Sequence, residues 1–199
     1  MADAKTIQTY NQLAYEYDEE TATFWDRFPR DFLDTFITQA GNNILDVGCG
    51  PGRDGLILKS HGLKVIGLDA SITMVKIALE RGLPAVVGDF MALPFEDGEF
   101  SSVWAYTSLL HVSKTDFDGA LQQIHRVLKP DGILALGMII GEGEGFRLSA
   151  GVDRPRWFSY YSKEELHQSL SEAGFKISGY DTIQPRTSQY AHIIAEKYN

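Results

Sequence analysis

The sequence has 199 residues, a length that suits a single domain. Its formal net charge of −9 at pH 7 argues against a nucleic-acid-binding protein, because such proteins gather Lys and Arg against phosphate. A neutral or cationic small partner fits this charge better. The single Cys49 cannot form an internal disulfide, and no charged start followed by an apolar stretch marks a secretory signal. No apolar run reaches the roughly 20 residues that cross a bilayer, so we expect a soluble, cytoplasmic protein without a membrane partner.

Residues 1–42 are rich in aromatic side chains at helical spacing, and we expect them to form a helical cap. From residue 43 onward, short apolar runs alternate with helical periodicity, which is the pattern of a parallel sheet with crossover helices. The expected strands are Asn43–Val47, Lys64–Asp69, Ala85–Asp89, Phe100–Tyr106, Ile133–Ile140, Phe175–Thr182 and Tyr190–Lys197.

Two helix boundaries and one strand connection are defined by short motifs. An apolar stripe from Phe117 to Leu128 stops at Lys129-Pro-Asp-Gly132, and Ser162 with Glu165 forms a capping box for a later helix. The connection at 184–186 is too short for a crossover helix, so the last strand should run antiparallel. We therefore divide one domain, 1–199, into a cap (1–42), a cofactor-binding core (43–140), an insertion or lid (141–161) and a final helix with an antiparallel hairpin (162–199).

A glycine-rich turn follows the first expected strand. Gly48, Gly50 and Gly52 allow a sharp turn and close approach to a ligand, and the next helix presents free N–H groups. The structural alternative, that these glycines serve tight packing alone, does not account for so dense a run. We expect a ligand site at this turn.

The same glycines also fit a dinucleotide fingerprint. Gly50-x-Gly52-x-x-Gly55, with Asp69 at the end of the second strand, is the arrangement that binds NAD. Asp46 would repel a pyrophosphate, whereas the ammonium and sulfonium of S-adenosylmethionine would be attracted to it. Asp46 thus favours the cationic cofactor.

On these residues the chain resembles the class I S-adenosylmethionine-dependent methyltransferases, over nearly all of its length. Asp46-Val-Gly-Cys-Gly-Pro-Gly52 matches the family's Asp-x-Gly-x-Gly-x-Gly turn, Asp69 matches the acid that closes strand two, and Gly88-Asp89-Phe90 matches the third signature. The resemblance implies S-adenosylmethionine as cofactor and a Rossmann-like, seven-stranded mixed sheet, mostly parallel, with helices on both faces.

The resemblance also implies roles for individual residues. Asp69 would accept from both ribose hydroxyls, Asp89 would accept from the adenine amino group, and the backbone N–H of Phe90 would donate to the ring. Ala70 and Ile72 stand where the family encloses adenine between apolar side chains, although Ile72 also fits a core-facing stripe. The end of strand four would supply a backbone carbonyl for the methionine ammonium. The expected cofactor-binding residues are Asp46, Gly48, Gly50, Gly52, Asp69, Ala70, Ile72, Asp89, Phe90, Ala105 and Tyr106.

Methyl transfer from a sulfonium is an in-line displacement, so the protein needs no covalent residue, and we expect no metal. An acceptor hydroxyl or protonated amine needs a base, and His111 is the best-placed histidine because it follows strand four at the carboxyl edge of the sheet. The alternative is that His111 packs against the next helix and helps to seat the cofactor.

Acceptor specificity is expected from the cap and from the insertion after strand five. Aromatic walls with a few arginines suit a small planar or carboxylate-bearing acceptor, although the arginines also fit solvent-exposed positions near Glu142 and Glu144. The predicted acceptor-binding residues are Tyr10, Tyr17, Arg147, Arg156 and Tyr160.

The sequence therefore predicts methyl transfer from S-adenosylmethionine to an oxygen or nitrogen atom of a small-molecule acceptor. Two alternatives stay open at this point: a catalytically silent cofactor-binding or regulatory protein, and an NAD-dependent dehydrogenase. The sequence makes no prediction about the acceptor's identity or about the oligomeric state.

Overall fold

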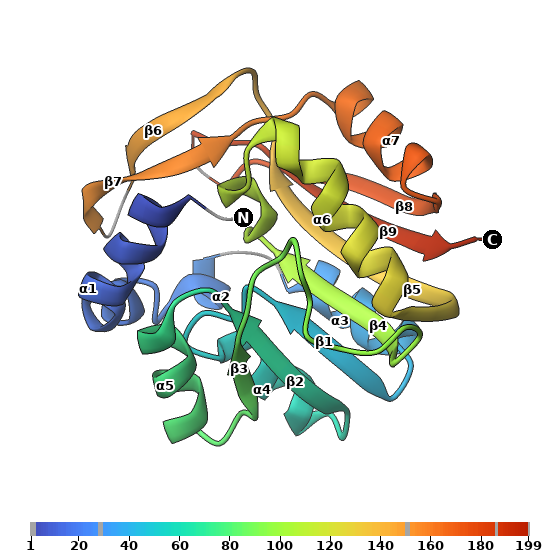
Figure 1. Cartoon of the computed structure of the whole chain (residues 1–199), viewed down its shortest axis with the longest axis horizontal. Coiled ribbons are helices and arrows are strands. Elements are labelled where there is room, and N and C mark those ends of the chain that lie inside the picture. Colours follow the sequence, from blue (N-terminus) through green and yellow to red (C-terminus); the bar gives the residue numbers. More distant parts are fainter. Residues whose placement is uncertain (1–2, 28–29, 150–151, 186, 199) are drawn as a thin grey trace.

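A seven-stranded sheet runs through the centre of the computed structural model, which describes residues 3–27, 30–149, 152–185 and 187–198 (Figure 1). Its strands are β1 Asn43–Val47, β2 Lys64–Asp69, β3 Ala85–Val87, β4 Phe100–Tyr106, β5 Leu128–Ile139, β8 Phe175–Ile183 and β9 Tyr190–Lys197. They lie in the order β3-β2-β1-β4-β5-β9-β8. The first five are parallel, and β9 is antiparallel to both of its neighbours. The mixed, mostly parallel sheet predicted from the sequence is confirmed.

The bounds of β1, β2, β4 and β9 agree with the prediction. Strand β5 begins earlier than expected, because Leu128 pairs with Phe100 before a bulge restores the register at Ile133. Strand β3 ends at Val87, and Asp89 forms only an isolated bridge with Ala92.

Helices cover both faces of the sheet. They are α1 Ala4–Glu20, α2 Phe24–Arg27, α3 Asp31–Gln39, α4 Arg53–Ser60, α5 Ile72–Glu80, α6 Lys114–Val127 and α7 Lys163–Glu172, with a 3₁₀ turn η1 at Leu109–His111. The apolar stripe of α6, which includes Phe117 and Leu121, packs on one face together with Leu166 of α7. Leu33 of α3 and Leu58 of α4 pack on the other. The capping box of Ser162 and Glu165 is present as predicted.

A second, two-stranded sheet occupies most of the segment expected as an insertion. It consists of β6 Glu144–Ser149 and β7 Val152–Ser159, which were not predicted as strands. Helix α1 lies beside this hairpin (Figure 1), where the Trp157 N–H donates to the Thr6 hydroxyl at 2.8 Å. On its other side, Asn11 accepts from the Ser71 hydroxyl ahead of α5 at 2.7 Å. Helix α1 thus bridges the hairpin and the main sheet.

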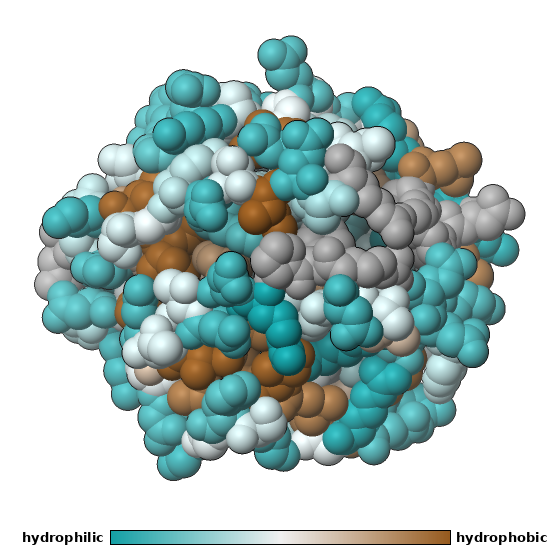
Figure 2. All heavy atoms as spheres, turned by 180° about the vertical axis from the view of Figure 1, so that it is seen from behind, coloured by the Kyte–Doolittle hydropathy of each residue, from teal (hydrophilic) through white to brown (hydrophobic). Residues whose placement is uncertain are grey.

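The face turned away in Figure 1 carries apolar side chains in separate patches among hydrophilic ones (Figure 2). Within the described ranges, no helix has the length and apolar character that a membrane span requires.

Candidate active site

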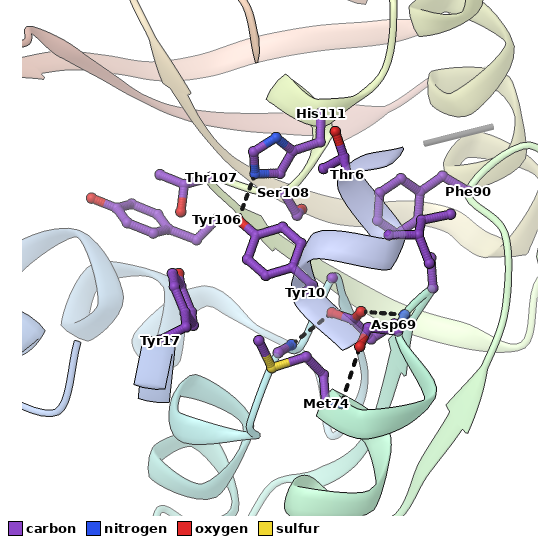
Figure 3. A pocket seen from close by; sticks show the side chains of 15 residues that line it. Thr6, Tyr10, Tyr17, Asp69, Met74, Phe90, Tyr106, Thr107, Ser108 and His111 are labelled. Carbon is purple, nitrogen blue, oxygen red and sulfur yellow. Dashed lines mark hydrogen bonds between the residues drawn. The ribbon is translucent and has the colours of Figure 1, made fainter. Parts of the chain in front are cut away.

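A cavity of about 570 Å³, its opening included, lies at the carboxyl ends of β1, β2 and β4, beneath helix α1 (Figure 3). Ligands of open parallel sheets bind at this edge. The residues that line the cavity are Thr6, Ile7, Tyr10, Tyr17, Gly48, Gly50, Asp69, Ala70, Ser71, Met74, Phe90, Tyr106, Thr107, Ser108 and His111.

The glycine-rich turn forms one wall of the cavity. A Cβ on Gly48 would stand 2.2 Å from the Cβ of Ser108, so glycine is required where the turn meets the end of β4. A Cβ on Gly50 would meet nothing within 4 Å, and Gly50 has a φ of +52°. Gly50 therefore leaves open space in the cavity wall, where a ligand can approach the backbone.

Asp69 closes β2 beside this turn. Its two carboxylate oxygens accept from the backbone N–H groups of Gly50 at 2.9 Å and Ser71 at 2.8 Å. The Ala70 N–H also contributes, and since a carboxylate has about four acceptor positions, Asp69 can still accept a hydrogen bond from a ligand hydroxyl. Removal from bulk water raises the pKa of Asp69, and its hydrogen bonds from backbone N–H groups oppose that rise.

Two further carboxyl groups lie behind the turn. Asp46 is 2% exposed and accepts from the Gly55 N–H, yet its Oδ2 has no partner among the described residues. Asp54 accepts from the indole N–H groups of Trp25 at 2.7 Å and Trp104 at 2.8 Å. Burial and the neighbouring acids raise the pKa of Asp46 well above its usual range. This concentration of acidic groups disfavours a polyphosphate and favours a cationic ligand.

The end of β4 supplies the cavity floor. Tyr106 lines it and hydrogen-bonds Nε2 of His192 on β9 at 3.0 Å. Thr107 follows with a φ of +51°, a left-handed conformation that is unfavourable for a β-branched residue. Strained residues of this kind gather at functional sites, because the surrounding structure has to hold them.

Tyr10 and His111 meet at the other side of the cavity (Figure 3). The Tyr10 hydroxyl lies 2.8 Å from Nε2 of His111, and Nδ1 of His111 lies 2.6 Å from the carbonyl oxygen of Trp157. A carbonyl can only accept, so Nδ1 carries a proton. Burial lowers the pKa of His111 to about 3, which keeps the ring neutral. Nε2 is therefore an acceptor, and the Tyr10 hydroxyl donates to it.

Arg156 of β7 completes this network. Its Nη1 donates to the Tyr10 oxygen at 2.6 Å, and its guanidinium lies over the rings of Tyr10, Tyr17 and Phe158. Burial raises the pKa of Tyr10, and the hydrogen bond and charge of Arg156 act in the opposite direction.

The structure brings many of the predicted site residues together in this one cavity. Those that line it are Tyr10, Tyr17, Gly48, Gly50, Asp69, Ala70, Phe90, Tyr106 and His111. These residues include predicted cofactor-binding residues, predicted acceptor-binding residues and the predicted base, so all three groups of predicted residues contribute to the same cavity.

Other predicted cofactor residues do not line the cavity. Asp46 faces the start of α4, as described above. Gly52 begins α4 with a φ of +85° and packs on Ala78, while Ala105 is fully buried among core side chains. Ile72 is 65% exposed at the first residue of α5. Asp89 lies near the cavity, next to Phe90, and accepts from the Met91 N–H at 3.1 Å.

The predicted acceptor residues of the hairpin also lie outside the cavity lining. Arg147 is exposed on β6 and donates to the neighbouring Phe146 carbonyl. Tyr160 stacks on Phe158 at 6.2 Å between ring centroids. Arg156, in contrast, is only 3% exposed, so its alternative interpretation as a surface arginine is wrong.

Sequence reasoning missed six lining residues: Thr6, Ile7, Ser71, Met74, Thr107 and Ser108. For the first two the signal was present, because Thr6 and Ile7 stand four and three residues before Tyr10 and so share its side of a helix. Ser71 follows Asp69 as the N-cap of α5. Nothing in the sequence reveals the left-handed backbone of Thr107.

The cavity fits S-adenosylmethionine on the structure's own evidence. Gly50 offers open backbone, Asp69 can still accept from a ribose hydroxyl, and the acids around the turn include a buried oxygen of Asp46 without a partner. No group of three His, Cys, Asp or Glu side chains in the described ranges is arranged to hold a metal ion.

Comparison with known proteins agrees with this fit. A family model described as "Methyltransferase domain" matches residues 45–136. The 27-O-demethylrifamycin SV methyltransferase of Amycolatopsis mediterranei is 30% identical, over 92% of this chain and 72% of that protein. The O-methyltransferase resE of Aspergillus sclerotiorum is 29% identical, over 89% of this chain and 70% of that protein.

A solved structure has the same fold. The 1,6-didemethyltoxoflavin-N1-methyltransferase of Burkholderia thailandensis, crystallised with 1,6-didemethyltoxoflavin and S-adenosylhomocysteine, superposes with a TM-score of 0.74 at 20% identity, covering 97% of this chain and 88% of that one. The relatives and the acidic glycine-rich turn leave no support for a nicotinamide cofactor. The chain belongs to the S-adenosylmethionine-dependent methyltransferases, with S-adenosylmethionine as its cofactor.

Proposed function

We propose that this enzyme methylates an oxygen or nitrogen atom of a small-molecule acceptor that binds beneath helix α1. The names of the relatives support both kinds of atom, because they include O-methyltransferases and an N1-methyltransferase. The net charge of −9 argues against a nucleic-acid acceptor. We keep the cytoplasm as the predicted location.

The residues that would hold the cofactor lie on the β1, β2 and β3 side of the cavity. Asp69 would accept from a ribose hydroxyl, the open backbone at Gly50 would face the methionine portion, and Phe90 with Ala70 would border the adenine. When bound, S-adenosylmethionine supplies a methyl group on a sulfonium, which makes that carbon an electrophile. The acceptor then has to fill the remaining space near Tyr10, Tyr17 and His111.

The single observation that carries the proposal is the directed hydrogen bond from Tyr10 to His111 at the acceptor side of the cavity. The Tyr10 oxygen already accepts from Arg156 and has one further acceptor position. An acceptor hydroxyl, or an amine bound in its neutral form, can donate a proton to that position. As it does so, the Tyr10 proton moves to Nε2 of His111, and the Trp157 carbonyl stabilises the imidazolium through Nδ1.

The pKa shifts of Tyr10 and His111 indicate the protonation states from which this transfer starts. Burial opposes a standing phenolate at Tyr10 and holds the pKa of His111 near 3, so neither group removes a proton before the reaction. Instead, the pair polarises the O–H or N–H bond of a hydroxyl or neutral amine and takes the proton as that oxygen or nitrogen forms its bond to carbon. This is general-base assistance of the kind that contributes about 10²–10⁴-fold to a rate. An ammonium would have to lose a proton first, because its nitrogen has no lone pair.

The experiment has two stages. Calorimetry with S-adenosylmethionine, S-adenosylhomocysteine and NAD should show binding of the first two only. The protein is then incubated with methyl-labelled S-adenosylmethionine and a panel of hydroxyl- and amine-bearing metabolites, and label should move to members of the panel. Tight cofactor binding without transfer to any compound would favour the catalytically silent alternative and overturn the proposal.

A further inference from the structure

Arg156 is a buried cation for which the described side chains provide no counter-charge. It is 3% exposed, its Nη1 donates to the neutral Tyr10 hydroxyl, and its Nε is buried without an acceptor. The ion pairs found among the described side chains do not include it. A buried guanidinium is costly unless it is paired with an anion, so this position requires an explanation other than stability.

Three aromatic rings hold the guanidinium in place. Its central carbon lies 5.1 Å from the ring centroid of Tyr10, 5.7 Å from that of Tyr17 and 5.4 Å from that of Phe158. Ring faces attract a cation, but they do not satisfy its N–H donors. The rings therefore fix the position of the charge and leave the Nε–H free for an acceptor.

This charge lies at the acceptor end of the cavity. Tyr10 and Tyr17 line the cavity, and the guanidinium lies over both rings. Arg156 donates to the same Tyr10 hydroxyl that faces His111. Arg156 itself does not line the cavity, and the Tyr10 and Tyr17 rings pack edge-on at 5.3 Å, so an anion reaches the guanidinium when these two rings move apart.

The hairpin adds a second, independent observation. Arg147 on β6 is the direct register partner of Arg156 on β7, so two cations face each other across one antiparallel pair. Like charges in that relationship destabilise a sheet. An anion bound by the free N–H of Arg156 would reduce this repulsion.

We propose that Arg156 binds a carboxylate or phosphate group of the methyl acceptor. The proposal rests on the function proposed above and names the chemical class of the acceptor: a small molecule with a compact anionic group next to the hydroxyl or amine that is methylated. The planar guanidinium can form two parallel hydrogen bonds to a carboxylate or to a phosphate. The carboxylate of the cofactor could form the same hydrogen bonds, so the test has to distinguish it from the anionic group of the acceptor.

The test uses inorganic phosphate as the probe and the protein saturated with S-adenosylhomocysteine. Phosphate titrated at constant ionic strength should raise the melting temperature of the wild type with a saturable dependence. Arg156→Gln should weaken this response about tenfold or more, as expected for loss of charge-assisted hydrogen bonds. Arg156→Lys, which keeps the charge but not the fork, should respond at an intermediate level. The difference between the proteins separates binding from the general stabilising effect of phosphate.

Arg154→Gln is the matched control, because Arg154 lies on the same strand, is exposed and contacts Gln12 of helix α1. It should respond to phosphate as the wild type does. Saturable phosphate binding that depends on Arg156, with unchanged affinity for S-adenosylhomocysteine, supports the proposal. Absence of a phosphate response in the loaded wild type overturns it. A loss of S-adenosylhomocysteine affinity in Arg156→Gln, with phosphate competing against that ligand, also overturns it and assigns Arg156 to the cofactor's carboxylate.

Neither readout requires turnover, so failure here can be distinguished from failure to transfer a methyl group. Once labelled products are available, the same variants give a third measurement. Arg156→Gln should raise KM for an anionic acceptor at least about tenfold and reduce the preference for that acceptor over its uncharged amide or dephosphorylated counterpart. Equal preference in the wild type and the variant would contradict the proposal.

Discussion

The hydroxyl of Tyr10 lies 2.8 Å from Nε2 of His111, across 101 positions of the sequence. This bond joins helix α1 to the turn after β4, at the side of the cavity where we propose that the acceptor binds. Helix α1 therefore contributes to the site directly, through Thr6, Tyr10 and Tyr17, as well as covering it.

Replacing Tyr10 by Phe should lower kcat by about 10²-fold or more, because the ring stays while the hydroxyl that we propose receives the acceptor's proton is lost. Cofactor affinity should change less than about threefold, since Asp69 and the glycine turn are untouched. Labelled-methyl transfer and calorimetry measure the two quantities. Tyr17→Phe is the matched control, because Tyr17 lines the same cavity and packs edge-on against Tyr10 at 5.3 Å without contacting His111. Equal rates for the two variants would remove the Tyr10 hydroxyl from the proton path.

The low pKa of His111 should show in the pH dependence of stability. The folded protein holds this ring neutral down to about pH 3, whereas the unfolded chain protonates it near pH 6.5. Between these values the unfolded state binds more protons, so His111 lowers the free energy of unfolding as the pH falls, by up to about 1.4 kcal/mol per pH unit.

His111→Gln should therefore lose less stability than the wild type between pH 7 and pH 5 in urea unfolding experiments. Asp46, Asp54 and Asp69 have raised pKa values and act in the opposite direction, but they are present in both proteins and cancel in the difference. Parallel stability curves would contradict the assignment of a buried, neutral His111.

Alanine at Gly50 separates binding from folding. The left-handed φ of +52° should cost about 1–2 kcal/mol of stability, and the added methyl should project into the open space of the cavity wall. We expect affinity for S-adenosylhomocysteine to fall about tenfold or more. Gly82→Ala is the control, because Gly82 has a φ of +89° and equally open surroundings but lies outside the cavity lining. Gly82→Ala should lose a similar amount of stability and keep its affinity for S-adenosylhomocysteine. If both variants lost a similar amount of affinity, the effect of Gly50→Ala would be purely structural.

Asp69→Asn should weaken cofactor binding by about 1.5–3 kcal/mol, the usual value of hydrogen bonds to a charged group. The amide also turns an N–H donor toward the N–H of Gly50 or Ser71, which disturbs the turn. Calorimetry with S-adenosylhomocysteine measures the loss. Asp97→Asn serves as the comparison, because Asp97 is 81% exposed in a surface ion pair with Arg126, and such pairs contribute little. Unchanged affinity in folded Asp69→Asn would exclude Asp69 from the site.

Sequence patterns predicted the main sheet well, because its strands are short apolar runs between clear turn and capping signals. The bounds of β1, β2, β4 and β9 show this, as does the capping box at Ser162. The hairpin β6–β7 was missed because Gly145 and Pro155 interrupt its segments, and because its contacts with α1 join distant parts of the chain, which no local pattern reveals.

Site residues could be predicted where the local backbone requires a particular residue type, as at Gly48, which has no room for a Cβ, and at Asp69, which accepts from the N–H of Gly50. They could not be predicted where chemistry depends on distant partners. The sequence indicates His111 as a base but does not show that Tyr10 occupies its Nε2, and it does not distinguish the buried Arg156 from the exposed Arg147. Those distinctions come from tertiary packing of segments more than 100 residues apart.

The position of β9 constrains how the chain folds. Because β9 lies between β5 and β8, β8 cannot join the sheet until the segment that follows it has paired with β5. His192 on β9 also holds the hydroxyl of Tyr106 in the cavity floor. A chain whose synthesis has only reached β8 would thus have its glycine turn and Asp69 in place but an unfinished floor, and we expect it to acquire cofactor affinity late, together with its final strand.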